Sequence, residues 1–457
     1  MSALWTSDEI AAATGGAASG AFVVNAVTFD SREVEAGSLF LALKGEVTDG
    51  HRFVAKAYAA GAAGAIVSEP VDGPHVLVPD AMAALNALGT AARLRAPAKR
   101  VGVTGSVGKT GTKEALADAL ARGNKGAVHR SVKSYNNHTG VPLTLSRMPR
   151  DAAFGVFEMG MNHSGELAKL TQLVRPHVAL VTTIAPAHIE YFGTEDKIAD
   201  AKGEIFAGLE PGGTAIIPFD SPHRDRLIAA ARPHAAHIVT FGRAAGADVT
   251  ALEVIPKAEG THIMARLPGA ELSFTLSQPG DHWVSNALAV LAAVQAVGGD
   301  LAAAGLALAD MAGLAGRGAR HRVAVPSGGT ALLLDESYNA NSASMRATLS
   351  VLAGLPATRR IAVLGEMREL GAASEALHAE LAGPVQQAGV SLAILVGNGM
   401  APLARALAGI CETVHVASAD AALETLEGAM RDGDALLIKG SNAVGLSRIV
   451  NALTSGS

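Results

Sequence analysis

The residues with the clearest chemical signature lie between positions 101 and 112, where a β-branched run leads into a glycine-rich turn. Gly105 and Gly108 allow the backbone to turn with its N–H groups pointing inward, and the predicted helix that follows adds the positive end of its dipole. Lys109 supplies a positive charge for the β and γ oxygens of a polyphosphate, and the Thr110 hydroxyl can ligate Mg²⁺. The predicted phosphate site consists of Gly105, Ser106, Val107, Gly108, Lys109, Thr110 and Gly111.

The spacing of this turn is that of a short variant of the phosphate-binding loop. Position 101 is valine, and Gly102 stands three residues before Gly105. The alternative is a glycine-rich connection between a strand and a helix that contains an incidental lysine. The order of strand, turn, Lys-Thr pair and helix favours the phosphate site.

Two polar residues stand at the ends of apolar strands. Glu158 directly follows the run at 154–157, and His188 follows the run at 178–184. A Mg²⁺ ion that bridges two phosphates needs carboxylate oxygen opposite the threonine hydroxyl, so Glu158 is a predicted metal ligand. The alternative for Glu158 is a buried ion pair. His188 is either an ordinary loop histidine or a contact to metal or substrate.

Two further residues are ambiguous from the pattern alone. Lys202 lies beside the apolar stripe of a predicted helix at 196–206, where composition predicts a solvent-exposed pair with Glu204 or Asp196. Asn286 lies in the first turn of a predicted alanine-rich helix. Its amide can donate and accept hydrogen bonds at once, so it either reads the edge of a base or is an ordinary surface asparagine.

The residues before the turn, 1–97, are expected to form a domain of their own. Thr6 and Glu9 form a capping box for an opening helix, and short strands and helices follow. Polar loops at the strand ends, one of which contains Ser31 and Arg32, are either ligand contacts or solvated turns.

The rest of the chain is expected to form two more domains. In residues 98–317 the glycine-rich turn is the first strand-to-helix connection, which indicates a largely parallel sheet with helices on both faces. Residues 318–457 open with a strand at 330–334 and alternate strands with helices in the manner of a dinucleotide-binding fold. That first strand lacks a Gly-x-Gly-x-x-Gly turn, so we do not expect a dinucleotide there. The predicted fold is α/β, in three domains.

Composition narrows the class of protein. The 457 residues are 49% hydrophobic and carry a formal charge of −5, which supports packed cores and argues against a nucleic-acid partner. The single cysteine, Cys411, excludes a disulfide framework and fits a reducing compartment. The N-terminal residues lack the pattern of a secretory signal, and no apolar run has a membrane-spanning length. We therefore expect a soluble, cytoplasmic protein.

Together these segments resemble the Mur ligases, the family that extends the peptide stem of peptidoglycan in the bacterial cytoplasm with ATP. The resemblance implies a small N-terminal α/β domain for a UDP-linked substrate, a central P-loop parallel-sheet ATPase domain and a C-terminal Rossmann-like α/β domain. It covers nearly the whole chain and rests on the segments at 30–32, 50–53, 105–110, 136–142, 158–162, 187–190, 201–205 and 335–341.

The resemblance also implies roles for single residues, with ATP and Mg²⁺ as cofactors. The implied substrate-binding residues are Ser31, Arg32, Asn136, Asn137, Asn339 and Asn341. The implied metal ligands are Thr110, Glu158, His188 and Lys202 as a carbamate, a modification that turns the cation into a carboxylate-like ligand. The implied nucleotide contacts beyond the turn are Asn286 for adenine, Arg317 for the γ-phosphate and Asp335 for the ribose. Lys109, Glu158, His188, Lys202 and Arg317 form the implied catalytic set.

The segments at 365–371 and 338–341 are similar to the family member that adds D-alanyl-D-alanine to the UDP-N-acetylmuramoyl tripeptide, through an acyl phosphate. These small molecules are the expected partners, and we expect a monomer. The alternatives are another amino-acid-adding Mur ligase, a folylpolyglutamate-synthase-like ligase and a regulatory P-loop NTPase. Trp283, Ser342 and Asn442 depart from the family pattern, where asparagine, proline and arginine are usual.

Overall fold

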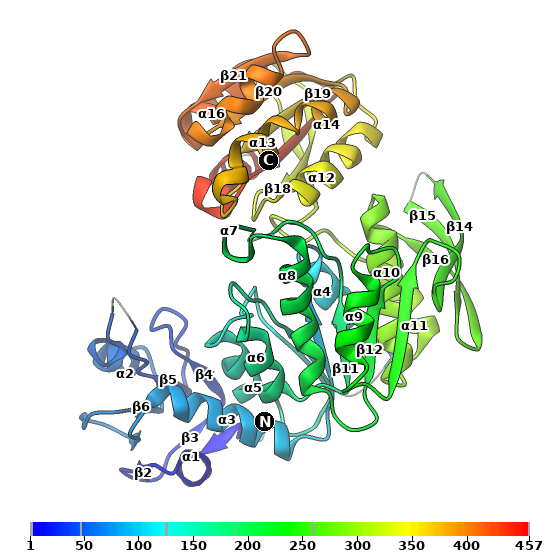
Figure 1. The fold of residues 1–457 in the computed structure, drawn as a ribbon. Helices are drawn as coiled ribbons and strands as arrows, with labels where there is room; N and C mark the ends of the chain where they lie inside the picture. Colours follow the sequence, from blue (N-terminus) through cyan, green and yellow to red (C-terminus); the bar gives the residue numbers. More distant parts are fainter. Residues whose placement is uncertain (1–2, 46–47, 124–126, 188, 258–259, 456–457) are drawn as a thin grey trace.

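The computed structural model describes residues 3–45, 48–123, 127–187, 189–257 and 260–455. In this part of the chain the strands form three large sheets and one two-stranded sheet. Figure 1 shows the N-terminal unit in blue and the C-terminal unit in yellow, orange and red at separate places on the central unit. The large sheets lie within the three ranges predicted for the domains.

The N-terminal unit contains a five-stranded sheet of order β2-β7-β6-β5-β4 and the antiparallel pair β1-β3. Its opening helix begins as predicted, because Thr6 accepts a hydrogen bond from Glu9 N and the Glu9 side chain accepts one from Thr6 N. The elements are β1 (Trp5–Thr6), α1 (Ser7–Thr14), β2 (Ala17–Ala18), β3 (Val23–Val24), β4 (Ala26–Thr28), β5 (Ser38–Leu41), α2 (Val54–Ala59), β6 (Gly64–Val67), β7 (His75–Leu77) and α3 (Ala81–Arg95).

Helix α3 ties this unit to the next one. Its face at Gly89 lies against Pro142 and Leu145 of the central unit, close enough that a Cβ at Gly89 would be 3.2 Å from Leu145 Cβ. The Trp5 indole donates a 2.9 Å hydrogen bond to Ser146 O, and the Arg95 guanidinium stacks on the Trp5 ring. The N-terminal unit is therefore packed on the central unit through apolar and polar contacts.

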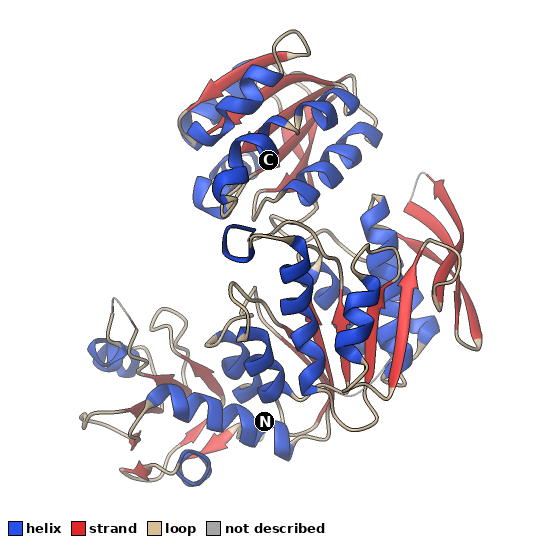
Figure 2. Cartoon of the chain, viewed as in Figure 1, coloured by secondary structure: helices blue, strands red, loops and turns tan. Residues whose placement is uncertain are grey.

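The central sheet has the order β16-β15-β14-β13-β12-β11-β8-β10-β9. It is parallel from β9 to β14, as expected, and helices cover both faces (Figure 2). Its elements are β8 (Lys99–Thr104), α4 (Lys109–Gly123), β9 (Ala127–Arg130), α5 (Gly140–Ser146), β10 (Ala152–Glu158), α6 (Glu166–Val174), β11 (Val178–Val181), α7 (Ile189–Phe192), α8 (Glu195–Gly203), β12 (Thr214–Pro218), α9 (Arg224–Ala231), β13 (His237–Gly242), β14 (Val249–Lys257), β15 (Gly260–Leu267), β16 (Ala270–Leu276), α10 (Asp281–Ala296) and α11 (Leu301–Ala309).

Two hydrophobic cores hold this sheet. Val101 and Val103 of β8 pack with α4 and α10 on one face, whereas Ala179 and Val181 of β11 pack with the helices on the other face. All four side chains are fully buried. Successive residues of a strand point to opposite faces, so a continuous apolar run fits a strand that is covered on both sides. The antiparallel extension β14-β15-β16 lies beyond this covered part.

The C-terminal sheet has the order β17-β18-β22-β19-β20-β21. It opens with β17, which runs antiparallel to β18, so the prediction that this unit begins at the strand 330–334 was wrong. The elements are β17 (Ala319–Ala324), β18 (Thr330–Glu336), α12 (Ser342–Gly354), β19 (Arg359–Gly365), α13 (Ser374–Ala379), α14 (Ala382–Gln387), β20 (Val390–Val396), α15 (Ala401–Ala406), β21 (Glu412–Val416), α16 (Ala419–Ala429), β22 (Asp434–Lys439) and α17 (Ser447–Thr454). Among the described residues, every helix is too short or too polar to cross a bilayer.

Candidate active site

The glycine-rich turn connects β8 to α4 in the conformation that a phosphate loop requires. Gly105 has φ 148° and Gly108 has φ 86°, both in the region that favours glycine. A Cβ at Gly105 would collide with the Thr182 hydroxyl, so no larger residue fits there. Because the turn directly follows the last residue of β8, it lies at the carboxyl edge of the central sheet, where parallel α/β sheets bind their ligands.

Lys109 is the first residue of α4, and its side chain folds back over the turn. Its Nζ donates a 2.7 Å hydrogen bond to Gly105 O. Burial lowers the pKa of Lys109, and the charge of Arg317 lowers it further, whereas Glu158 raises it. A polyphosphate in the turn would add negative charge next to this ammonium and favour its charged form.

Not every predicted residue of the turn offers a free donor. Ser106 N donates to Thr183 O, and Ser106 Oγ donates to Ala185 O at 2.9 Å, so both groups bind the loop after β11. Val107 O accepts a 2.6 Å hydrogen bond from the Thr182 hydroxyl. In this arrangement the neighbouring strand end occupies the Ser106 N–H, and a nucleotide contact of Ser106 stays a prediction.

Glu158 lies at the end of β10 and is 1% exposed. Its Oε2 accepts a 2.8 Å hydrogen bond from the Thr110 hydroxyl, and its Oε1 accepts a 2.7 Å hydrogen bond from the Asn136 amide. A second contact holds its backbone, because Glu158 N donates to Ser131 Oγ at 3.1 Å. Thr110 and Glu158, two of the four predicted metal ligands, are thus already in contact.

This donor set fits Mg²⁺, which binds hard oxygen ligands and commonly takes only one or two of them from carboxylates. Among the described residues, no group of three or more His, Cys, Asp and Glu side chains forms a metal site by itself. Phosphate and water can supply further ligands to an ion here. His188, another predicted ligand, lies outside the described residues.

Lys202 lies near the end of α8 and is 1% exposed, so the predicted solvent-exposed pair with Glu204 or Asp196 was wrong. Among the described residues, Nζ has no hydrogen bond or ion pair, while Glu204 instead caps the start of α6 at Gly165 N. Burial lowers the pKa of Lys202 well below its usual value, and the charge of Lys109 lowers it further. The neutral amine that burial favours is the form that reacts with CO₂.

Arg317 and Asp335 lie where the chain passes from the central to the C-terminal unit. Arg317 stacks on the Tyr338 ring at 4.0 Å and donates a 2.8 Å hydrogen bond to Ser134 Oγ. The buried Asp335 carboxylate accepts from Gly316 N at 2.6 Å, and from Ser337 N and Oγ. These bonds anchor the connection to β18, so a ribose contact of Asp335, which stays a prediction, requires one of them to open.

Asn286 and Trp283 lie beside the turn, on α10. A Cβ at Gly108 would be 3.0 Å from Asn286 Oδ1, and one at Gly111 would be 2.8 Å from the Trp283 ring. Asn286 is buried at 7% exposure, so it is not an ordinary surface asparagine. Its contact with adenine stays a prediction. Trp283 covers the first turn of α4 and leaves no room for a side chain at Gly111.

The remaining predicted asparagines make local contacts. Asn137 Oδ1 accepts hydrogen bonds from Thr139 Oγ1 and Gly140 N at the start of α5. Asn341 is the N-cap of α12 in a capping box, and Asn339 Oδ1 accepts from Ala340 N. Asn136 contacts Glu158 rather than an open surface. Substrate contacts of these four residues stay predictions.

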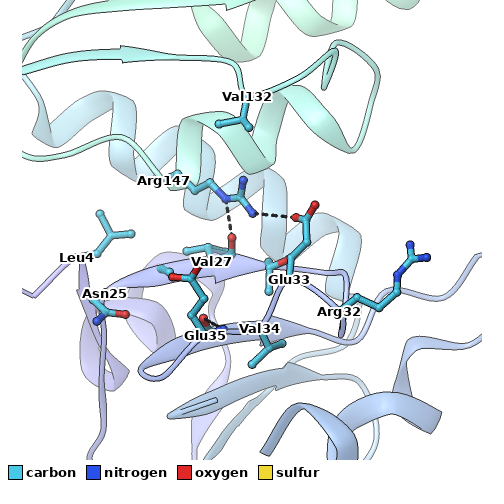
Figure 3. A pocket seen from close by; sticks show the side chains of 12 residues that line it. Leu4, Asn25, Val27, Arg32, Glu33, Val34, Glu35, Val132 and Arg147 are labelled. Atoms are coloured by element: carbon cyan, nitrogen blue, oxygen red, sulfur yellow. Dashed lines mark hydrogen bonds and ion pairs between the residues drawn. The ribbon is translucent and has the colours of Figure 1, made fainter. Parts of the chain in front are cut away.

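A cavity of about 470 Å³ lies between the N-terminal and central units (Figure 3). Arg32 and Glu33 line it from one side, and Val132 and Arg147 from the other. The Asp30 carboxylate forms an ion pair with Arg32 at 2.7 Å, and the hydrogen bond from Arg32 lowers the pKa of Asp30 to about 2. The predicted residue Ser31 is adjacent to these residues but is not part of the lining.

Sequence reasoning missed residues that hold these parts together. Lys113 is fully buried in α4 and donates a 2.6 Å hydrogen bond to Ser131 O. Glu33 pairs with Lys133 at 2.7 Å and accepts from the Tyr135 hydroxyl, which joins the two units at the cavity. The available signal for Lys113 was its position four residues after Lys109, one turn further along the same helix.

Sequence comparison matches three consecutive regions of the chain, which correspond to its three large sheets, to models of one family. Residues 23–103 match the Mur ligase family, catalytic domain, residues 103–294 match the Mur ligase middle domain, and residues 321–442 match the Mur ligase, glutamate ligase domain.

Individual relatives agree along the whole length. The UDP-N-acetylmuramoyl-tripeptide–D-alanyl-D-alanine ligase of Escherichia coli is 37% identical over 94% of each chain, and that of Bacillus subtilis is 32% identical over 94% of this chain and 93% of its own. A crystal structure of MurF from Acinetobacter baumannii covers 99% of each chain at 31% identity with a TM-score of 0.85. MurF ligase from Thermotoga maritima in complex with ADP covers 94% of this chain and 97% of its own at 25% identity with a TM-score of 0.78. With matches in all three of its regions, this chain belongs to the Mur ligase family.

Proposed function

We propose that this chain is an ATP-dependent ligase that joins D-alanyl-D-alanine to UDP-N-acetylmuramoyl tripeptide. The observation that carries the proposal is the convergence of Lys109, Thr110 and Glu158 at the carboxyl edge of the central sheet, with Arg317 reaching the same region from the domain connection. The choice of substrates rests on the names of the full-length relatives.

The reaction needs an activated carboxylate, because a carboxylate does not acylate an amine at neutral pH. The terminal carboxylate oxygen of the tripeptide forms a bond to the γ-phosphorus of ATP, and the bond to the β–γ bridging oxygen breaks, which gives an acyl phosphate and ADP. The free amine of D-alanyl-D-alanine then attacks the acyl carbon. The amine loses a proton, inorganic phosphate leaves with the electrons of the C–O bond, and an amide remains.

The residues of the site act on charge and position in this reaction. Lys109 and Arg317 neutralise the charge that develops on the transferring phosphoryl group. Thr110 and Glu158 would hold Mg²⁺, which supplies Lewis-acid stabilisation of the phosphate oxygens when bound. Asn136 keeps the Glu158 carboxylate oriented through its 2.7 Å hydrogen bond. No covalent intermediate with a protein side chain is required.

Lys202 would serve this site as a carbamate. Its neutral amine attacks CO₂, forms an N–C bond and releases a proton, and the product carries a negative charge. This negative charge near the Lys109 ammonium is favourable, whereas a second cation at that place is disfavoured. The low exposure of Lys202 and its lack of a hydrogen-bond partner among the described residues support the proposal.

The three domains would supply the three reactants. The cavity at Arg32 would take the UDP end of the first substrate. The turn would bind ATP, and Asn339 and Asn341 at the edge of the C-terminal sheet would contact the acceptor. Bringing reactants together from separate domains lowers the entropic part of the barrier.

The test is ADP release with the UDP-N-acetylmuramoyl tripeptide, with and without D-alanyl-D-alanine. We expect ADP to form in equal amount to the ligated product, and only when both the tripeptide and the dipeptide are present. Diamino acids offered with the UDP-muramoyl dipeptide test the other amino-acid-adding reaction. ATP turnover that needs neither a UDP-linked peptide nor an amine would overturn the proposal.

A further inference from the structure

His378 is a fully buried histidine in α13 of the C-terminal unit, far in sequence from every predicted site residue. Its Nε2 accepts a 2.9 Å hydrogen bond from Met367 N, and its Nδ1 lies 2.7 Å from Ser374 O. Both ring nitrogens are therefore used, one by a loop and one by the helix that carries the histidine.

These two contacts define the proton position on the ring. A backbone N–H can only donate, so Nε2 must present its lone pair to Met367. The proton then lies on Nδ1, which donates to the Ser374 carbonyl oxygen. Burial lowers the pKa of His378, which agrees with a neutral ring. A second proton would place two donors against each other at Met367.

Met367 belongs to residues 366–370, the loop that follows β19 and that we name the β19 loop. Arg368 N donates to Ser441 Oγ at 3.0 Å, and Ser441 N donates to Glu366 O at 3.2 Å, so the β19 loop is fastened to the loop after β22. The Ser342 hydroxyl lies 3.8 Å from Met367 Sδ, at the start of α12. The loops after β19 and β22 and the start of α12 thus meet around Met367, at the edge where such sheets bind ligands.

The β19 loop also reaches the central unit. Glu190 N donates to Glu369 O at 3.4 Å, and Glu190 lies on α7, the helix that directly follows position 188. Gly371 is so close to Glu190 that a Cβ there would be 3.3 Å from Glu190 Cγ. The loop therefore lies between the C-terminal sheet and the central domain.

We propose that His378 is a positioning residue for the D-alanyl-D-alanine side of the site, acting through the β19 loop. It does not touch the reacting atoms. Its acceptor nitrogen holds Met367 N and thereby fixes the loop that faces the acceptor. This inference rests on the proposed function, since it assigns the C-terminal sheet edge to the acceptor.

Two substitutions separate the two ring contacts. In His378→Gln the side-chain oxygen can take the place of Nε2 and accept from Met367 N. In His378→Asn the shorter side chain can reach Ser374 but not Met367. Loss of one hydrogen bond to a buried N–H corresponds to about a tenfold change in an equilibrium constant. We expect His378→Asn to raise the KM for D-alanyl-D-alanine about tenfold, whereas His378→Gln stays close to the wild type.

The KM values for ATP and for the UDP-linked tripeptide are the internal controls and should stay within twofold of the wild type in both variants. Ser441→Ala removes a different anchor of the same loop and should also raise only the KM for the dipeptide, which keeps the test valid if His378→Asn does not fold. Equal changes in all three KM values, or no change in Ser441→Ala and His378→Asn, would overturn the proposal. Failure of the wild type to ligate the dipeptide would instead overturn the proposed function.

Discussion

The Thr110 hydroxyl donates a 2.8 Å hydrogen bond to the Glu158 carboxylate, so the start of α4 and the end of β10 are joined at the predicted magnesium site. Residue Thr110 is 6% exposed and Glu158 is 1% exposed. Among the residues that the structure describes, the Glu158 carboxylate accepts two side-chain hydrogen bonds and forms no ion pair. Burying a carboxylate in this way is costly, and a metal ion would lower that cost. The contact thus holds in place the two oxygen groups that are predicted to ligate Mg²⁺.

The first prediction concerns Glu158. Glu158→Gln keeps the size of the side chain and an oxygen for Thr110 or Asn136 but removes the charge. We expect kcat to fall by roughly 10²- to 10³-fold, the range for loss of one electrostatic contact in an active site, with an increased Mg²⁺ requirement. ADP release measured against Mg²⁺ concentration checks this. Thr110→Ser keeps the hydroxyl and is the matched control, for which we expect activity close to the wild type.

The second prediction concerns Lys202. Lys202→Ala should abolish ligation, because the carbamate that would complete the metal site cannot form. Added acetate or another short-chain carboxylate should restore part of the activity by placing a carboxylate in the space that the lysine leaves. Lys197→Ala, an exposed lysine on the same helix, is the matched control and should keep full activity. Absence of any rescue over a series of acids would contradict the carbamate role.

The third prediction concerns the cavity between the N-terminal and central units. Arg32 is held by Asp30 and presents its guanidinium at the rim, with its side chain 80% exposed. Arg32→Ala should raise the KM for the UDP-linked substrate by about 10- to 100-fold, the range for a hydrogen bond to a charged group, and leave the KM for ATP unchanged. Lys56→Ala removes an exposed cation from α2 of the same unit and should change neither value.

Local sequence patterns were sufficient to predict the parts of the site that lie in a single strand-to-helix turn or at the end of a single strand. The turn from Gly105 to Thr110 and the position of Glu158 at a strand end follow from the order of residue types, because the carboxyl ends of parallel strands meet at one edge. The capping box at Thr6 is equally local. These features were confirmed because their geometry depends on neighbours only a few residues away.

Features that depend on packing between residues far apart in the sequence could not be predicted from local patterns. Helical periodicity places Lys202 beside an apolar stripe, but only the folded chain reveals what packs on its side of α8. Whether Ser106 N faces a ligand is decided by Thr183, at the end of another strand. Asp335 was assigned to a ligand by resemblance, whereas its carboxylate binds Gly316 N across the domain connection.

The fourth prediction concerns acid stability and His129. His129 lies on β9, where its Nε2 is 2.6 Å from Thr144 O and its ring faces Phe157. Burial lowers the pKa of His129 to about 4. The unfolded chain, with a histidine pKa of about 6.5, binds the proton more readily than the folded one. The contribution of neutral His129 to the free energy of unfolding is therefore fully present above about pH 6.5 and is lost as the pH falls toward about 4.

The difference between the two pKa values corresponds to up to about 3 kcal/mol of unfolding free energy, which disappears over this pH window. His129→Gln can keep a donor to Thr144 O but cannot take up a proton, so its unfolding free energy should depend less steeply on pH between 6.5 and 4. Denaturant unfolding of both proteins at several pH values measures the slopes. The slopes should differ by close to one proton, because only the wild type gains the proton at this position on unfolding. Parallel slopes would show that His129 is already charged in the folded protein, in conflict with the effect of its burial.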